Sequence, residues 1–85
     1  MNENEEIGYN PILHEQIHNV VENQIKMNKP KETKQTLERL MNIGYSRHEA
    51  IHKIGTVVVK EIFDVEKNKE PYNEMRYVKR LSELK

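Results

Sequence analysis

Residues 46–65 read SRHEAIHKIGTVVVKEIFDV and predict the longest helix of the chain, over residues 46–67. Ser46 and Glu49 have the spacing of a capping box, in which each side chain bonds the backbone amide of the other residue. Gly55 costs a helix about 1 kcal/mol relative to alanine, so we expect it to allow close approach by another helix. The apolar residues recur every three or four positions, as a helix with one buried face requires: Ile51, Ile54, Val58, Ile62 and Val65.

The remaining sequence predicts three further helices and no strand hairpin. Asn10 and Pro11 form a typical helix start, and Gly44 forms a typical helix end. Pro71 predicts the start of the last helix. We therefore expect an all-α fold, a small bundle or orthogonal array of four helices. The three predicted ranges are 10–28, 30–43 and 71–84.

Length and charge limit the kind of protein. The 85 residues suffice for one domain, which we place at residues 10–85 after a flexible acidic tail at residues 1–9. Lys and Arg number 14, as do Asp and Glu, so the net charge is zero and a nucleic-acid-binding protein is not expected. No apolar run approaches the roughly 20 residues of a membrane-spanning helix. The acidic start is unlike a signal peptide, so we expect a cytoplasmic protein that does not bind membranes.

All four histidines occur in two pairs, His14/His18 and His48/His52. Each pair has i, i+4 spacing, which places both rings on one face of a helix, one turn apart. On a helical wheel, both pairs lie at the edge of the apolar face. If these two helices pack together, four imidazoles can converge, and imidazole is a common ligand of transition metals. Because the chain has no cysteine, only imidazole and carboxylate groups are expected to bind a metal ion.

Glutamates beside the histidines are candidate carboxylate ligands. Glu22 continues the helical stripe of His14 and His18. Glu15 and Glu49 each precede a histidine by three residues, a spacing used in di-iron helical bundles. Spacing does not choose among zinc, nickel, iron and manganese. The predicted metal-binding residues are His14, His18, His48, His52, Glu22 and Glu49.

Two polar residues are predicted to support the fold or the site without binding a metal ion. Gln24 lies in the apolar face of its helix, where its amide needs hydrogen-bond partners. It therefore either pins a loop or orients a histidine. Arg47 either pairs with Glu22, binds an anionic ligand or is simply solvated.

The two histidine segments are also compatible with functions other than metal binding. The segments 14–18 and 48–52 both read H-E-x-x-H, the zinc motif of many metalloproteases. We do not expect a protease, because nothing in so short a chain predicts a substrate cleft with a strand beside it, and Glu49 serves the capping box. No catalytic residue is predicted, and a binding domain is favoured over an enzyme. The alternative is a protein-interaction or regulatory module with a structural histidine cluster, in which a homodimer or protein partner enlarges the small core.

Three segments carry a family pattern: NPILHEQIHNVVENQI from residue 10, TLERLMNIGYSRHEAIHKIG from residue 36 and EPYNEMRYVKRL from residue 70. They resemble a family of small bacterial helical domains of unknown function, with the pattern N-P-x-L-H-x3-H-x3-E-x-Q followed by R-H-E-A-x-H. The resemblance covers residues 10–81 and implies an all-α fold with a histidine-centred site and no established reaction. It favours Glu22 over Glu15 as a ligand, since the pattern does not specify Glu15. It points to Asn10, Pro11, His14, His18, Glu22, Gln24, Arg47, His48, Glu49 and His52.

Overall fold

The computed structural model describes residues 11–85, with side chains from residue 13 onward, and this part of the chain consists of α-helices joined by short connections. Its helices are α2 (Pro11–Met27), α3 (Lys31–Asn42), α4 (Arg47–Asn68) and α5 (Glu74–Glu83). They confirm the predicted fold class and match the four predicted helices. The predicted tail at residues 1–9 and Asn10, which is predicted to begin the first helix, lie outside the described residues.

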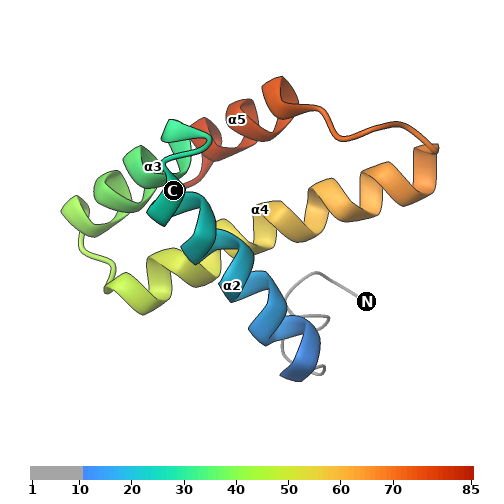
Figure 1. The fold of residues 1–85 in the computed structure, drawn as a ribbon. Helices are drawn as coiled ribbons and strands as arrows, with labels where there is room; N and C mark the ends of the chain where they lie inside the picture. The colour runs from blue at the N-terminus through green and yellow to red at the C-terminus, as the bar shows by residue number, and fades with distance from the viewer. Residues whose placement is uncertain (1–10) are drawn as a thin grey trace.

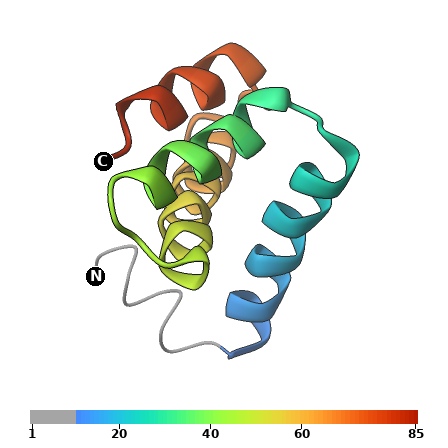
Figure 2. The same ribbon diagram turned by 90° about the vertical axis from the view of Figure 1, so that its left-hand side faces the viewer.

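Helix α4 is the centre of the fold. It contacts α2, α3 and α5, and α3 also contacts α2 and α5. Figures 1 and 2 show α3 and α5 side by side, with α2 crossing the first half of α4. Every helix contributes one apolar face to a shared core, which is the arrangement that the spacing of apolar residues predicts. The buried apolar residues are Ile17, Val21, Leu37, Leu40, Ala50, Ile51, Ile54, Val57, Val58, Val59, Tyr77 and Leu81.

The start of α4 and its contact with α2 are as the sequence predicts. The Ser46 amide donates to Glu49 Oε1 at 2.9 Å, and the Glu49 amide donates to Ser46 Oγ at 3.1 Å, which completes the predicted capping box. Farther along α4, a Cβ atom added to Gly55 would lie 3.0 Å from Cγ2 of Ile17 on α2. The prediction that Gly55 permits close approach by another helix is therefore confirmed, and that helix is α2.

The last helix begins three residues later than predicted. Its first residue is Glu74, not Pro71, and its N-cap is Asn73, whose Oδ1 accepts a hydrogen bond from the Arg76 amide at 3.1 Å. A helix that begins at Pro71 would have Glu70 as its N-cap, which is not among the preferred N-cap residues, whereas asparagine is one of the strongest. Local capping thus decides where α5 starts.

None of the helices in residues 11–85 is long and apolar enough to cross a membrane.

Candidate functional site

The two histidine pairs meet where α2 crosses α4. His14 and His18 lie on α2, and His48 and His52 lie on the first two turns of α4. The closest rings are those of His14 and His18, which stack with centroids 4.3 Å apart and an interplanar angle of 26°. The other centroid distances are 5.4 Å for His14–His52, 5.4 Å for His18–His48 and 6.0 Å for His18–His52. The predicted convergence of four imidazoles is confirmed, and we call these four residues the histidine cluster.

The close approach of the two helices explains this convergence. Ile17 follows His14 by three residues, and Gly55 follows His52 by three residues. The Cγ2 methyl of Ile17 lies only 3.0 Å from the position that a Cβ atom of residue 55 would occupy, so α2 occupies space that a larger residue would fill with its side chain. Because residues three apart on a helix are neighbours on its surface, this contact brings the rings of His14 and His52 together one turn away.

The environment of His18 is unusual for a polar side chain. Its Nε2 atom is buried and has no hydrogen-bond partner. Burial lowers the pKa of His18, and the neighbouring histidines His14, His48 and His52 lower it further. Burial is also the main reason why the pKa of His52 is lowered. Both rings therefore favour the neutral form, which is the form that binds metal ions.

The rings converge, but their present orientation is not that of a metal-bound set. Within the described residues, no group of three or more His, Cys, Asp or Glu side chains is already arranged to hold a metal ion. The stacking of His14 on His18 gives the physical reason. An imidazole nitrogen binds a metal ion close to the plane of its own ring, at about 2.0–2.1 Å. Two nearly parallel rings with centroids 4.3 Å apart cannot share one ion until one ring rotates.

Glu22 lies beside the histidine cluster and binds Arg47. The guanidinium donates from Nη1 to Glu22 Oε2 at 2.7 Å and from Nη2 to Glu22 Oε1 at 2.8 Å. These bonds lower the pKa of the Glu22 carboxyl and raise that of Arg47. Of the three options for Arg47, the pairing with Glu22 is the one observed. The residues His18, Glu22, Arg47, His48 and Ile51 line a shallow hollow of about 290 Å³.

Glu49 is held by the start of its own helix. Its carboxylate accepts the Ser46 amide, and this hydrogen bond is the main reason why its pKa is lowered. Its ligand role, like that of Glu22, stays a prediction, because both carboxylates are engaged by protein donors. On the same side of the cluster, His48 and His52 border an open hollow of about 590 Å³. There the Lys53 ammonium lies 4.8 Å from the centroid of the Tyr45 ring.

Gln24 joins three helices and is not bonded to a histidine. Its Oε1 atom accepts hydrogen bonds from Thr33 Oγ1 at 2.8 Å and from the Tyr77 hydroxyl at 2.7 Å. Thr33 lies on α3 and Tyr77 on α5, 9 and 53 positions after Gln24 in the sequence. The side-chain amide of Gln24 on α2 therefore links α2 to both helices. The predicted need for partners is confirmed, and they lie on helices rather than on a loop.

Sequence reasoning missed a buried carboxylate on α4. Glu61 is 3% exposed and accepts hydrogen bonds from Arg76, at 3.0–3.1 Å, and from Arg80, at 2.9 Å. Arg76 and Arg80 are one turn apart on α5, so both reach the same carboxylate. The i, i+4 arginine pair on an amphipathic helix is the signal that could have indicated it. These bonds fix α5 against α4 and lie away from the histidine cluster.

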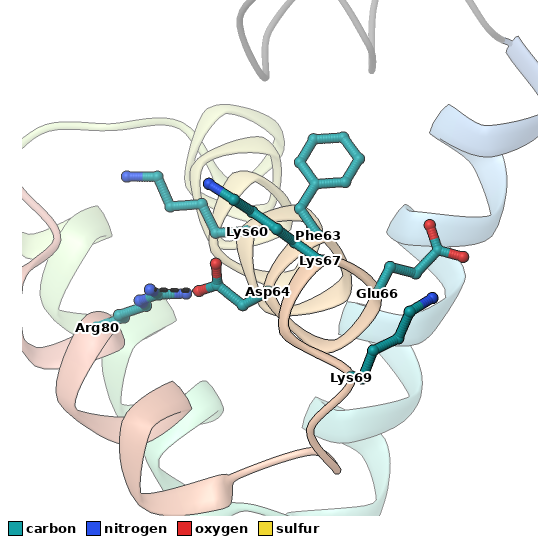
Figure 3. A pocket seen from close by; sticks show the side chains of 7 residues that line it. All are labelled: Lys60, Phe63, Asp64, Glu66, Lys67, Lys69 and Arg80. Atoms are coloured by element: carbon teal, nitrogen blue, oxygen red, sulfur yellow. Dashed lines mark ion pairs between the residues drawn. The ribbon is translucent and has the colours of Figure 1, made fainter.

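An open hollow of about 790 Å³ lies beside the C-terminal half of α4. Figure 3 shows its lining, in which Arg80 of α5 reaches across to form an ion pair with Asp64. Exposed basic and acidic side chains surround this pair. None of the predicted site residues contributes to it. The lining residues are Lys60, Phe63, Asp64, Glu66, Lys67, Lys69 and Arg80.

Comparisons with known proteins give a family and no known activity. The searches of curated proteins and of solved structures found no match. The family itself is described as a domain of unknown function, so membership assigns no reaction, ligand or partner. The matched segment spans both histidine pairs as well as Glu22, Gln24 and Arg47. Because the family model Domain of unknown function (DUF1841) matches residues 2–83, nearly the whole chain, the protein belongs to this family.

Proposed function

We propose that this protein binds a divalent transition metal ion through His14, His18, His48 and His52. The observation that carries the proposal is the meeting of two i, i+4 histidine pairs from two helices, with ring centroids 4.3–6.0 Å apart. Four imidazoles at this spacing are close enough to supply three or four ligands to one ion after small side-chain rotations.

The state of His18 supports the proposal. A buried polar atom without a hydrogen-bond partner costs free energy, and such atoms are rare in folded proteins. A metal ion bound to the Nε2 of His18 would remove this cost. The neutral form that burial favours at His18 and His52 adds to the argument, since no proton has to be displaced before binding.

Metal binding requires a rotation in the stacked histidine pair of α2, and it does not depend on the predicted carboxylate ligands. Either His14 or His18 must leave the stacked arrangement, which needs only rotation of a half-buried side chain. The sequence also predicts Glu22 and Glu49 as carboxylate ligands, a role for which each would have to leave its partner, Arg47 or Ser46. Imidazole ligands suit zinc, nickel and iron, and an added carboxylate also suits manganese.

Elemental analysis of the untagged protein tests the proposal directly. We expect about one equivalent of metal in the wild type, and a strong loss of metal in His18→Ala and His52→Ala. Glu15→Ala is the matched control, because Glu15 is exposed on the same helix as His18. Trace metal in the wild type, or metal content unchanged by both histidine variants, would refute the proposed site.

Thermal unfolding provides a second readout of the same site. Added zinc at about 100 times its dissociation constant should stabilise the folded state by about 2.7 kcal/mol, because only the folded state assembles the cluster. The stabilisation should be lost in His18→Ala and kept in Glu15→Ala. Equal stabilisation of all three proteins would mean that zinc binds elsewhere.

A protein-interaction module is the second candidate function, and one surface feature favours it. An apolar groove of about 380 Å³ lies where α2 and α4 meet the segment before α5. Val20, Ile62 and Tyr72 line this groove together and are 39%, 44% and 52% exposed, and a contiguous exposed apolar patch is typical of an interaction surface. A second copy of the chain is the simplest occupant. This alternative predicts a dimer in solution and a melting temperature that a chelator leaves unchanged.

A further inference from the structure

A side-chain ion pair spans the two helices that carry the histidines. Glu22 lies on α2, one turn after His18, and Arg47 lies on α4, directly before His48. The pair has two parallel hydrogen bonds of 2.7 and 2.8 Å between the guanidinium and the carboxylate. Such two-point bonding fixes both the distance and the relative orientation of the two groups.

The stability of the fold does not account for this pair. The Glu22 and Arg47 side chains are 43% and 51% exposed, and ion pairs this exposed contribute little to stability. Arg47 is also the first residue of α4, where the positive end of the helix dipole disfavours a cation. Arg47 is thus poorly suited to its helix position, yet it forms a two-point bond to another helix. A neighbouring site explains this bond better than the stability of the fold does.

The histidine cluster lies beside it. His18 and His48 line the same shallow hollow as Glu22 and Arg47, and their ring centroids are 5.4 Å apart. Ligand nitrogens that share one tetrahedral ion lie about 3.3 Å apart, given metal–nitrogen bonds of about 2.0–2.1 Å. Whether His18 and His48 can share one ion therefore depends on the separation of α2 and α4 at the end of the cluster that the ion pair spans.

We propose that the Glu22–Arg47 pair is a positioning clasp, which holds α2 against the start of α4 so that His18 and His48 can share one metal ion. This proposal rests on the proposed metal-binding function and assigns Glu22 a different role from that of a ligand. The carboxylate acts through Arg47, and neither residue touches the ion.

Zinc affinity of the full chain, measured by competition with a chromophoric chelator, tests the clasp. Removing either partner, in Glu22→Gln or Arg47→Met, should weaken zinc binding about tenfold, as is typical for residues that orient metal ligands. The charge-exchanged double variant Glu22→Arg/Arg47→Glu should recover most of the lost affinity, because it restores the pair in reverse. Without zinc, all three variants should melt close to the wild type.

Glu70→Gln is the matched control. Glu70 is also an exposed carboxylate paired with an arginine, at 3.6 Å from Arg76, and it lies outside the histidine cluster. Its removal should leave zinc affinity unchanged, which separates the clasp from a general effect of negative charge on a cation.

The sign of the Arg47→Met effect separates the alternatives. Tighter zinc binding in Arg47→Met would show that Glu22 is itself a ligand, freed from a competing partner, and would overturn the clasp. Unchanged affinity in both single variants, or no recovery in the double variant, would overturn it as well. If His18→Ala and His52→Ala also leave zinc affinity unchanged, the proposed metal site is wrong. If the histidine variants lose zinc affinity and the Glu22 and Arg47 variants do not, only the clasp is wrong.

Discussion

Replacement of Gly55 by alanine tests the packing that brings the histidines together. The added Cβ would lie 3.0 Å from Cγ2 of Ile17, which is tighter than nine in ten contacts of real Cβ atoms. Ile17 is 2% exposed, and its β-branched side chain has one preferred rotamer in a helix, so it cannot move aside easily. Crowding a packed core costs about 1–3 kcal/mol, against a gain of about 1 kcal/mol from the helix preference of alanine.

The expected net effect of Gly55→Ala is a loss of about 1 kcal/mol, measured by chemical unfolding followed by circular dichroism. In a domain of this size, it should lower the melting temperature by about 4–8 °C. Ile17→Leu removes the methyl group in contact and should partly rescue Gly55→Ala, with a coupling energy of at least 0.5 kcal/mol in the double-mutant cycle. Zinc affinity should fall in Gly55→Ala, since separated helices separate the rings.

A gain in stability for Gly55→Ala would refute this reasoning. It would mean that helix preference outweighs crowding at the crossing of α2 and α4. Zero coupling between the two substitutions would lead to the same conclusion, because it would show that the Gly55–Ile17 contact does not limit the helix separation.

Two further outcomes follow from buried polar groups. Tyr77→Phe removes a buried hydroxyl that donates to Gln24, while Thr33 still donates to the same oxygen. Chemical unfolding should show that the free energy of unfolding falls by about 1 kcal/mol. An unchanged free energy of unfolding would contradict a stabilising role for this bond. The lowered pKa values of His18 and His52 mean that the unfolded chain binds protons more readily. Stability of the metal-free protein should therefore be full above about pH 6.5 and decline as the pH falls through the folded-state pKa values, whereas a His18→Gln/His52→Gln variant should decline less.

The candidate site could be predicted from the sequence only up to the surfaces that each helix presents. The i, i+4 spacing places His14 beside His18 and His48 beside His52, and the capping pair Ser46 and Glu49 is equally local. The structure adds that the two surfaces meet, with His14 and His52 at 5.4 Å. Whether they hold a metal ion stays a prediction.

Long-range polar contacts were harder to predict, because a helical wheel shows which face a residue occupies and not which residue lies opposite. Gln24 was expected to need partners, but its donors Thr33 and Tyr77 come from two other helices. Glu61 was not predicted, because glutamate is almost never fully buried unless it is paired. Its burial depends on two arginines of α5 that approach only in the folded chain.

The sequence by itself determined the helices, their caps and the faces on which the histidines lie, because these depend on residues within about four positions of one another. Only the tertiary structure decided which faces meet and which charges pair, including the bond between Glu22 and Arg47 across 25 residues. That choice depends on how closely α2 can approach α4, and Gly55 permits the observed approach because Ile17 lies where a side chain at position 55 would be crowded. Such an approach distance comes from the packing of the whole core, and no local pattern encodes it.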